Sequence, residues 1–379
     1  MDNPGAVDMN LEPTPEERAM LEAIAQRTCA IVRTMGATAI IGGSLAKDTW
    51  LSGSRDIDVF ARFDVRSEEE LNERVPCLFE AFPDAEAVRG SRTYLRFETD
   101  GVMVEVIPIR PLGEDANTMD HSPDHIAYVR DHLTEPNEVR MLKTLLRANR
   151  IYGAESHVRG FSGYVCELLI IAHTTLNELA SAAKDWEIGA RVPLAQSKKT
   201  FDDPLVVEDP TDPERNAAAA VDEHSFTTFT TLMGRIARGE AIETLLEPRA
   251  IEPPYASVTM YAAHEKPDVG FAQLRGIHDR LERELEPFGV RDVQWQTHEA
   301  WESRFVLERT ELEPITIRVG PPVRLTSAAA SFKEHHPDAY EEDGRLHARI
   351  ERTETRWEEV VERICTHEHV ASFHAEYVR

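Results

Sequence analysis

Residues 42–60 read GGSLAKDTWLSGSRDIDVF, and this stretch decides the fold of the chain. The apolar run before it, residues 37–41, predicts a buried strand that the glycines end. Gly43 and Ser44 then open a short helical segment, whose free backbone N–H groups and dipole suit a bound phosphate. Asp56 and Asp58 lie two residues apart on a second predicted strand, so both carboxylates project from one face of it.

The two aspartates predict a metal site. Two carboxylates this close repel each other unless a hard divalent cation lies between them. A third acid, Glu105, lies within an otherwise apolar strand, residues 102–108, where an unpaired charge is costly to bury. Neighbouring strands could bring Glu105 beside the aspartates as a third ligand; the alternative is an edge carboxylate that faces water. A phosphate cradle beside paired carboxylates is typical of metal-assisted nucleotidyl transfer.

Composition predicts two or three domains and no membrane anchor. The 379 residues are 41% hydrophobic and 29% charged, as in an ordinary globular protein with a sizeable core. We find no apolar run long enough to span a membrane and no signal peptide. Cys29, Cys77, Cys166 and Cys365 lie far apart within apolar helical patterns, which favours buried free thiols over a metal site. We therefore expect a cytoplasmic protein.

The net charge of −26 is unusual for a protein that binds nucleic acid, because phosphate contacts supply most of that affinity. Arginine also far outnumbers lysine, with 35 arginines and 7 lysines among the 42 basic residues. A surface rich in carboxylates and poor in lysine leads to the hypothesis of a chain adapted to concentrated salt. There the Debye length falls to about 3 Å at 1 M, so the net charge is largely screened. We expect added KCl to improve folding and activity; full activity in dilute buffer with no gain from KCl would refute the hypothesis.

Hydrophobic periodicity predicts a mixed α/β chain with a domain boundary at residues 248–255, which include two consecutive prolines. A helix is expected over residues 15–34 with Thr14 as its N-cap, and strands with a hairpin then complete a small α/β domain. The pattern becomes helical from residue 121, with a long helix over 161–179 and a capped helix start at 212–216. Beyond the boundary we expect a second α/β region with a loop at 320–322.

The cradle and the aspartate pair resemble the signature of the polymerase-β-like nucleotidyltransferase superfamily. Five further sequence blocks narrow the resemblance to one family within this superfamily. These blocks are Gly43-Ser44-x-Ala46-Lys47-x-Thr49-Trp50, NEVRMLK at 137–143, IYGAE at 151–155, VRGFSGYVCELL at 158–169 and Asp209-Pro210-x-Asp212-x-x-Arg215-Asn216. Together they resemble the archaeal-type (class I) CCA-adding enzymes. The likeness is dense over residues 40–216 and thins beyond the proline boundary.

The resemblance implies an α+β fold with a nucleotidyltransferase head (residues 1–121), a helical neck (122–206), a body (207–248) and a C-terminal α/β tail that returns to the body (249–379). It implies a tRNA nucleotidyltransferase that adds C, C and A to the tRNA 3′ end from CTP and ATP. The reaction needs no nucleic-acid template and releases pyrophosphate. Body and tail would grip the acceptor and T arms of tRNA, no membrane takes part, and a homodimer is left open.

The resemblance also assigns catalytic residues. Asp56, Asp58 and Glu105 would hold two Mg²⁺ ions, one activating the RNA 3′-hydroxyl and one neutralising the triphosphate. Ser44, beside Gly43, would donate to the β- and γ-phosphates.

Further residues would complete the nucleotide site, namely Lys47, His125, Lys143, Tyr152 and Arg215. Lys143 would contact the triphosphate as a point charge and Tyr152 as a hydroxyl donor. From the sequence alone, the alternative for Lys143 is an exposed helix lysine, and the alternative for Tyr152 is a packing aromatic at a helix end. His125 would lie near the sugar, and Arg215 would read the Watson–Crick edge of C or A by rotating between two donor patterns. Without the family, both residues would be interpreted as surface groups.

Three features depart from the family pattern. The third carboxylate is typically aspartate, and Glu105 adds a methylene, although glutamate remains a hard oxygen ligand. Where the family tends to have a histidine near the nucleotide, the local match SRTY at 91–94 offers Arg92. The chain also looks shorter than expected, with a trimmed neck and C-terminus, which puts the strength of the grip on tRNA in question.

Two other functions stay open on the sequence. Another polymerase-β-like enzyme, either poly(A)-polymerase-like or acting on a small molecule, would share the cradle and the carboxylates but not residues 209–216. Unlimited A addition or transfer to an antibiotic would favour it. An RNA-binding protein without catalysis would keep the fold with Glu105 as the lesion, and it would bind CTP with Mg²⁺ without turnover.

Overall fold

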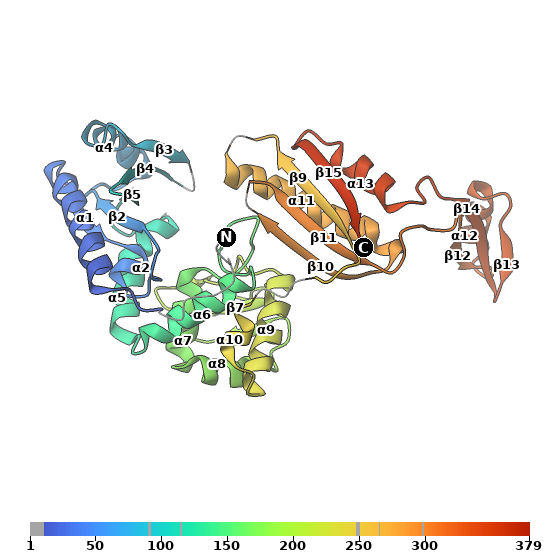
Figure 1. The fold of residues 1–379 in the computed structure, drawn as a ribbon, viewed down its shortest axis with the longest axis horizontal. Coiled ribbons are helices and arrows are strands. Elements are labelled where there is room, and N and C mark those ends of the chain that lie inside the picture. Colours follow the sequence, from blue (N-terminus) through green and yellow to red (C-terminus); the bar gives the residue numbers. More distant parts are fainter. Residues whose placement is uncertain (1–10, 90–91, 114–115, 248–250, 265, 298) are drawn as a thin grey trace. The chain divides into compact units, whose positions relative to one another are not determined.

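The computed structural model describes residues 11–379 apart from 90–91, 114–115, 248–250, 265 and 298 (Figure 1). The chain divides into two compact units, Met1–Pro248 and Arg249–Arg379, and each has its own hydrophobic core. The finer division of the first unit into head, neck and body stays a prediction.

A five-stranded sheet with the order β1-β2-β5-β4-β3 forms the first half of unit 1. Its strands are β1 (Thr38–Ile41), β2 (Asp56–Arg62), β3 (Glu86–Arg89), β4 (Thr93–Thr99) and β5 (Val102–Ile109). β2 and β5 are parallel, and the other neighbours are antiparallel. Because successive strand residues face opposite sides, Ile57 and Val59 are buried in the core while Asp56 and Asp58 lie on the other face.

The helix α1 (Pro15–Thr34) packs against β1 and β2 with its apolar face. It begins where predicted because Thr14 and Glu17 form a capping box, in which each side chain accepts a hydrogen bond from the other residue's backbone N–H at 3.1 and 2.8 Å. The expected helix is therefore confirmed. Two shorter helices, α3 (Glu68–Asn72) and α4 (Val75–Ala81), follow β2.

The second half of unit 1 is mainly helical. A 3₁₀ turn η1 (Thr118–His121) leads into α5 (Ser122–His132), α6 (Pro136–Ala148), α7 (Gly163–His173), α8 (Leu176–Ala183), α9 (Glu223–Ala237) and α10 (Ile242–Leu245). The prediction of one helix over 161–179 is wrong, because Thr174 has φ of +68° and ends α7. Thr175 then caps α8 by accepting a hydrogen bond from the backbone of Glu178 at 3.2 Å.

A small sheet of β6 (Ala190–Val192), β7 (Leu205–Asp209) and β8 (Asp212–Asn216) lies in the same half. The predicted helix start at 212–216 is wrong, since these residues form β8. The side chain of Asp209 accepts from the backbone of Thr211 at 3.0 Å, and the side chain of Asn216 accepts from the backbone of Val207 at 2.9 Å. These bonds close a hairpin where Asp and Pro would equally suit a helix start.

Unit 2 contains a four-stranded sheet with the order β10-β11-β9-β15. Its strands are β9 (Tyr255–Ala262), β10 (Val290–Thr297), β11 (Trp301–Leu307) and β15 (Val370–Val378), and its helices are α11 (Pro267–Leu285), the 3₁₀ turn η2 (Glu286–Phe288) and α13 (Trp357–Cys365). Trp301, Phe305 and Trp357 are buried in the core that these elements share.

A three-stranded sheet, β12 (Ile315–Pro322), β14 (Arg345–Glu351) and β13 (Tyr340–Glu342), completes unit 2 together with α12 (Thr326–His335). The predicted loop at 320–322 is wrong, because Pro322 pairs with Arg345 at the end of β12. A proline fits there since β12 is an edge strand, where the missing N–H removes no ladder bond.

No helix in the described part of the chain combines the length and the apolar character that a membrane span requires. All four cysteines are free thiols, and Cys29, Cys166 and Cys365 are buried.

Candidate active site

Acidic side chains gather where β2 lies beside β5. Asp58 and Glu105 are register partners, and Asp56 lies two residues earlier on the same face of β2. Burial raises the pKa of Asp58 to about 6, the negative charges of Glu105 and Asp56 add to this, and Lys47 opposes it. This excess of negative charge is what a hard divalent cation would relieve.

Glu105 is paired with Arg96 rather than solvated alone. The two residues face each other across β4 and β5, with Nε of Arg96 donating to Oε1 of Glu105 at 2.9 Å and Nη2 at 2.7 Å from the same oxygen. Among the described residues, no three His, Cys, Asp or Glu side chains are close enough together to hold one metal ion. The oxygen donors of Asp56 and Asp58 are of the kind that a hard cation prefers, whereas the Glu105 carboxylate is engaged by Arg96.

The predicted phosphate cradle packs directly against Asp58. The short helix α2 (Gly43–Ala46) follows β1, and the N–H of Gly42 donates to the carbonyl of Asp58 at 2.8 Å. Gly43 has φ of +59°, and a Cβ added to it would lie 1.9 Å from Oδ2 of Asp58. Glycine suits this position because it adopts positive φ and leaves room for the carboxylate. Ser44 follows in α2, partly buried.

A buried carboxylate, Glu167 of α7, holds the loop that follows α2. Its Oε2 accepts from Nζ of Lys47 and its Oε1 from the hydroxyl of Thr49, both at 2.5 Å. Lys143 of α6 donates to the carbonyl and the hydroxyl of Thr49 at 2.9 and 3.0 Å, and its Nζ lies 3.4 Å from Oε1 of Glu167. Lys143 is buried, so the alternative of an exposed helix lysine is wrong.

The charges in this cluster compensate each other. Burial acts to raise the pKa of Glu167, but Lys47 and Lys143 outweigh it and hold that pKa below its usual range. Burial lowers the pKa of Lys143, and Glu167 opposes this change. Two of the chain's seven lysines, buried Lys143 and partly buried Lys47, thus share one buried carboxylate next to the cradle.

Arg140 secures the same loop from one turn earlier on α6. Its Nε donates to the carbonyl of Trp50 at 2.9 Å, and its Nη2 donates to the carbonyl and the carboxylate of Asp48, both at 2.7 Å. The guanidinium is buried, and buried charges of this kind need such a complete set of partners. Helices α6 and α7 therefore fix residues 47–50 and, through them, the end of the cradle.

Tyr152 meets Lys143 at the first residue of α7. The Tyr152 hydroxyl and Nζ of Lys143 both border Gly163. Burial raises the pKa of Tyr152, so its hydroxyl remains a neutral donor. The ring also packs against the helical core, and the guanidinium of Arg147 lies 5.7 Å from its centroid. The residue is therefore a packing aromatic that presents a hydroxyl.

A second buried carboxylate, Asp209 at the end of β7, gathers the residues predicted for the sugar and the base. Its Oδ2 accepts from Nη1 of Arg215 at 2.5 Å and lies 3.2 Å from Nε2 of His125. Its Oδ1 accepts from the hydroxyls of Tyr164 at 3.1 Å and of Thr211 at 2.9 Å. Burial acts to raise the pKa of Asp209, but His125 and the hydrogen bonds of Thr211 hold it well below its usual range.

Tyr164 of α7 links the two clusters. Nζ of Lys47 lies 5.5 Å from the centroid of its ring, and the ring of His125 stacks on it at 4.2 Å between centroids. The structure therefore brings the predicted residues together as one continuous region of unit 1. Contacts run from the aspartates through the cradle, Glu167 and Tyr164 to Asp209.

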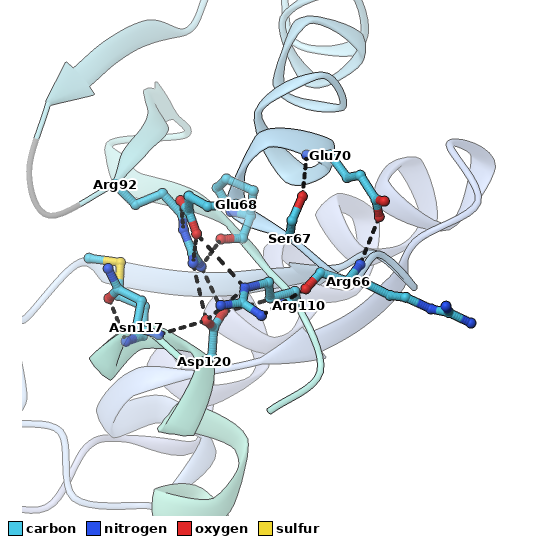
Figure 2. A network of polar contacts seen from close by, with 10 residues as sticks. Arg66, Ser67, Glu68, Glu70, Arg92, Arg110, Asn117 and Asp120 are labelled. Carbon is cyan, nitrogen blue, oxygen red and sulfur yellow. Dashed lines mark hydrogen bonds and ion pairs between the residues drawn. The ribbon is translucent and has the colours of Figure 1, made fainter. Parts of the chain in front are cut away.

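Arg92, which stands where the family tends to have a histidine, is buried and belongs to a network of polar contacts (Figure 2). Its Nε and Nη2 donate to Glu68 at 2.8 and 2.6 Å, and its Nη1 and Nη2 donate to Asp120 at 2.7 and 3.1 Å. Asp120 also accepts from the backbone of Arg110 and Asn117 at 3.0 and 2.9 Å. Both carboxylates occupy its guanidinium, so Arg92 makes structural contacts at the position where the family tends to have a histidine.

Sequence reasoning missed Glu167, Asp209 and Arg140 as parts of the site. A signal for Glu167 was present, since it lies within the apolar run VCELLII at 165–171 and a buried acid needs a partner. The same reasoning singled out Glu105. Asp209 was part of a matched block, but its partners lie 84 residues earlier and 6 residues later in the chain.

Comparison with protein families matches residues 137–244 to the second domain of tRNA nucleotidyltransferases. The CCA-adding enzyme of Halobacterium salinarum is 31% identical over 366 residues, which covers 88% of this chain and 80% of that protein. The CCA-adding enzyme of Methanopyrus kandleri is 31% identical and covers 93% and 84%. The one from Sulfurisphaera tokodaii is 40% identical over 228 residues, covering 58% and 55%.

Among solved structures, the Cid1 poly(U) polymerase with bound Mg and 3′-dATP has a TM-score of 0.50. The match covers 63% of this chain and 95% of that chain, with 12% sequence identity. At this identity the likeness concerns the fold alone, and it agrees with the predicted nucleotidyltransferase fold.

Proposed function

This chain belongs to the family of CCA-adding enzymes, and we propose that the region between Asp56 and Asp209 is where it extends tRNA with CTP and ATP. The chain is a nucleotidyltransferase that adds C, C and A to the 3′ end of tRNA without a template. The observation that carries the site assignment is that the cluster around Glu167 and the cluster around Asp209 are joined by contacts through Tyr164. One suits phosphates beside paired carboxylates, and the other presents a guanidinium for a base.

Enzymes of this family use divalent metal ions, and we assign Mg²⁺ here because carboxylate and phosphate oxygens are its preferred ligands. Asp56 and Asp58 would hold it, with Glu105 as the third carboxylate. When bound, Mg²⁺ supplies a Lewis acid for the RNA 3′-hydroxyl and countercharge for the triphosphate. Gly43 and Ser44 orient the phosphates through backbone and hydroxyl donors, while Lys47, Lys143 and Tyr152 supply further donors.

Arg215 selects the base in this proposal, with Asp209 as its support. One nitrogen of the guanidinium is held by Asp209, and within the described residues its other nitrogens make no hydrogen bond. The side chain is 30% exposed, so these N–H groups can meet the edge of an incoming base. His125, stacked on Tyr164, lies beside them for the sugar.

The tRNA acceptor and T arms are the proposed macromolecular partner, with unit 2 contributing to their binding. Four free thiols support a reducing cytoplasm as the place of the reaction. Light scattering of the purified chain at several concentrations distinguishes a monomer from the homodimer that the resemblance leaves open.

The test of the proposed function is incorporation of labelled CTP and ATP, with Mg²⁺, into tRNA that ends at its discriminator base. We expect labelling from both nucleotides, and none into the same tRNA that already ends in CCA. Unlimited A addition or transfer to a small acceptor would instead favour another polymerase-β-like activity. No incorporation from either nucleotide would contradict the proposal.

A further inference from the structure

The first residue of α7 borders two polar groups. A Cβ added to Gly163 would lie 3.2 Å from the hydroxyl of Tyr152 and 3.4 Å from Nζ of Lys143. Gly163 is partly exposed, whereas Lys143 is buried. The space that a side chain would occupy at Gly163 therefore lies next to both donors and next to solvent.

We propose that Gly163 is the opening through which the phosphates of the nucleotide reach Lys143 and Tyr152. The inference rests on the proposed function and gives a role to a residue without a functional group. A phosphate oxygen bound by both donors lies about 2.8 Å from each. A methyl group at residue 163 would fill nearly the same space and exclude that oxygen.

The contacts of Lys143 are arranged to allow this approach. Two of its bonds, to the carbonyl and hydroxyl of Thr49, are 2.9 and 3.0 Å long, but its distance to Glu167 is 3.4 Å. The third N–H can thus turn from Glu167 to a phosphate oxygen at little cost. Glu167 stays paired during this change because Lys47 and Thr49 each donate to it at 2.5 Å.

The Tyr152 hydroxyl, like the third N–H of Lys143, can donate a hydrogen bond to a phosphate oxygen. Within the described residues it makes no hydrogen bond, although its partly buried ring packs against the helical core. Gly163 and Glu167 are four residues apart and share one face of α7. This helix therefore carries both the opening at Gly163 and the carboxylate of Glu167 that holds Lys47 and Thr49. Gly163 is also helical without positive φ, so alanine is the better helix former there.

Binding of CTP and of inorganic tripolyphosphate, each with Mg²⁺, tests the inference by isothermal titration calorimetry without tRNA. We expect Gly163→Ala to weaken both ligands by about 10- to 100-fold, as for the loss of one or two charge-assisted hydrogen bonds. Its melting temperature should equal or exceed that of the unmodified chain. Gly276→Ala on α11 is the matched control, since nothing lies within 4 Å of its added Cβ, and its affinities should be unchanged.

Unchanged affinity in Gly163→Ala overturns the inference, and so does a loss that comes with a lower melting temperature, because packing would then explain it. If the unmodified chain binds neither ligand, the proposed function fails instead. Tyr152→Phe is the second variant and removes one of the two donors. The double variant should bind about as weakly as Gly163→Ala alone, since the methyl already blocks that donor; additive losses would contradict the shared opening.

Discussion

Replacing Asp58 with alanine is expected to lower the rate of nucleotide incorporation into tRNA by at least about 10³-fold. The carboxylate lies at the centre of the acidic cluster, between Asp56 on its own strand and Glu105 on the neighbouring one. Losing a metal ligand removes several kcal/mol of transition-state stabilisation, and each 1.4 kcal/mol is about tenfold in rate. Single-turnover incorporation of labelled CTP at saturating Mg²⁺ measures the effect.

The same change should not unfold the protein. The pKa of Asp58 is raised to about 6 in the folded chain, so its stabilising contribution is full below its unfolded pKa and is lost as the pH rises through 6. At pH 7.5 without metal, the charged group therefore opposes folding, and Asp58→Ala should melt at an equal or higher temperature. Asp64→Ala, an exposed acid just after β2, is the control and should keep full activity. Comparable losses in both variants would argue against a special role for Asp58.

Gly43→Ala is expected to reduce incorporation by about 10²-fold. Its Cβ would lie 1.9 Å from Oδ2 of Asp58, so the carboxylate or the cradle must move. Displacing a reacting group by about 1 Å is sufficient for a loss of that size. The backbone adds strain, because φ of +59° costs a residue with a side chain about 1–2 kcal/mol.

Gly36→Ala separates these two effects. Gly36 has φ of +77°, but nothing lies within 4 Å of an added Cβ. It should therefore show the backbone strain in its thermal stability and retain its rate of incorporation. Equal rates for Gly43→Ala and Gly36→Ala would show that the contact between the cradle and Asp58 is not needed for activity.

The sequence predicts well those features that depend on local periodicity and capping. The helix over 15–34 begins at its predicted cap because Thr14 and Glu17 satisfy each other within one turn. The Asp56 and Asp58 strand follows from alternation, since Ile57 and Val59 must enter the core. Errors occurred where one residue type suits two local structures, as at 212–216, which form β8 rather than a helix start.

The partners of the site residues could not be predicted, because they are set by packing between distant segments. Glu167 binds Lys47 across 120 residues, and Arg96 binds Glu105 from the neighbouring strand. Arg92 is a case in which a local sequence match did not indicate the partners of the side chain. It stands where the family tends to have a histidine, but its buried guanidinium is paired with Glu68 and Asp120 in a structural network. Motif spacing therefore predicts which chemical groups belong to the site, but it does not predict which side chains surround each of them.

Sequencing the 3′ ends of tRNA after incubation with CTP, ATP and Mg²⁺ is the most direct test of the central claim. The starting tRNA ends at its discriminator base, and Asp58→Ala provides the background. We expect the unmodified chain to extend most molecules by C, C and A and then to stop, with no extension by the variant. Products without this order, tails that continue beyond A, or equal products from Asp58→Ala would contradict it.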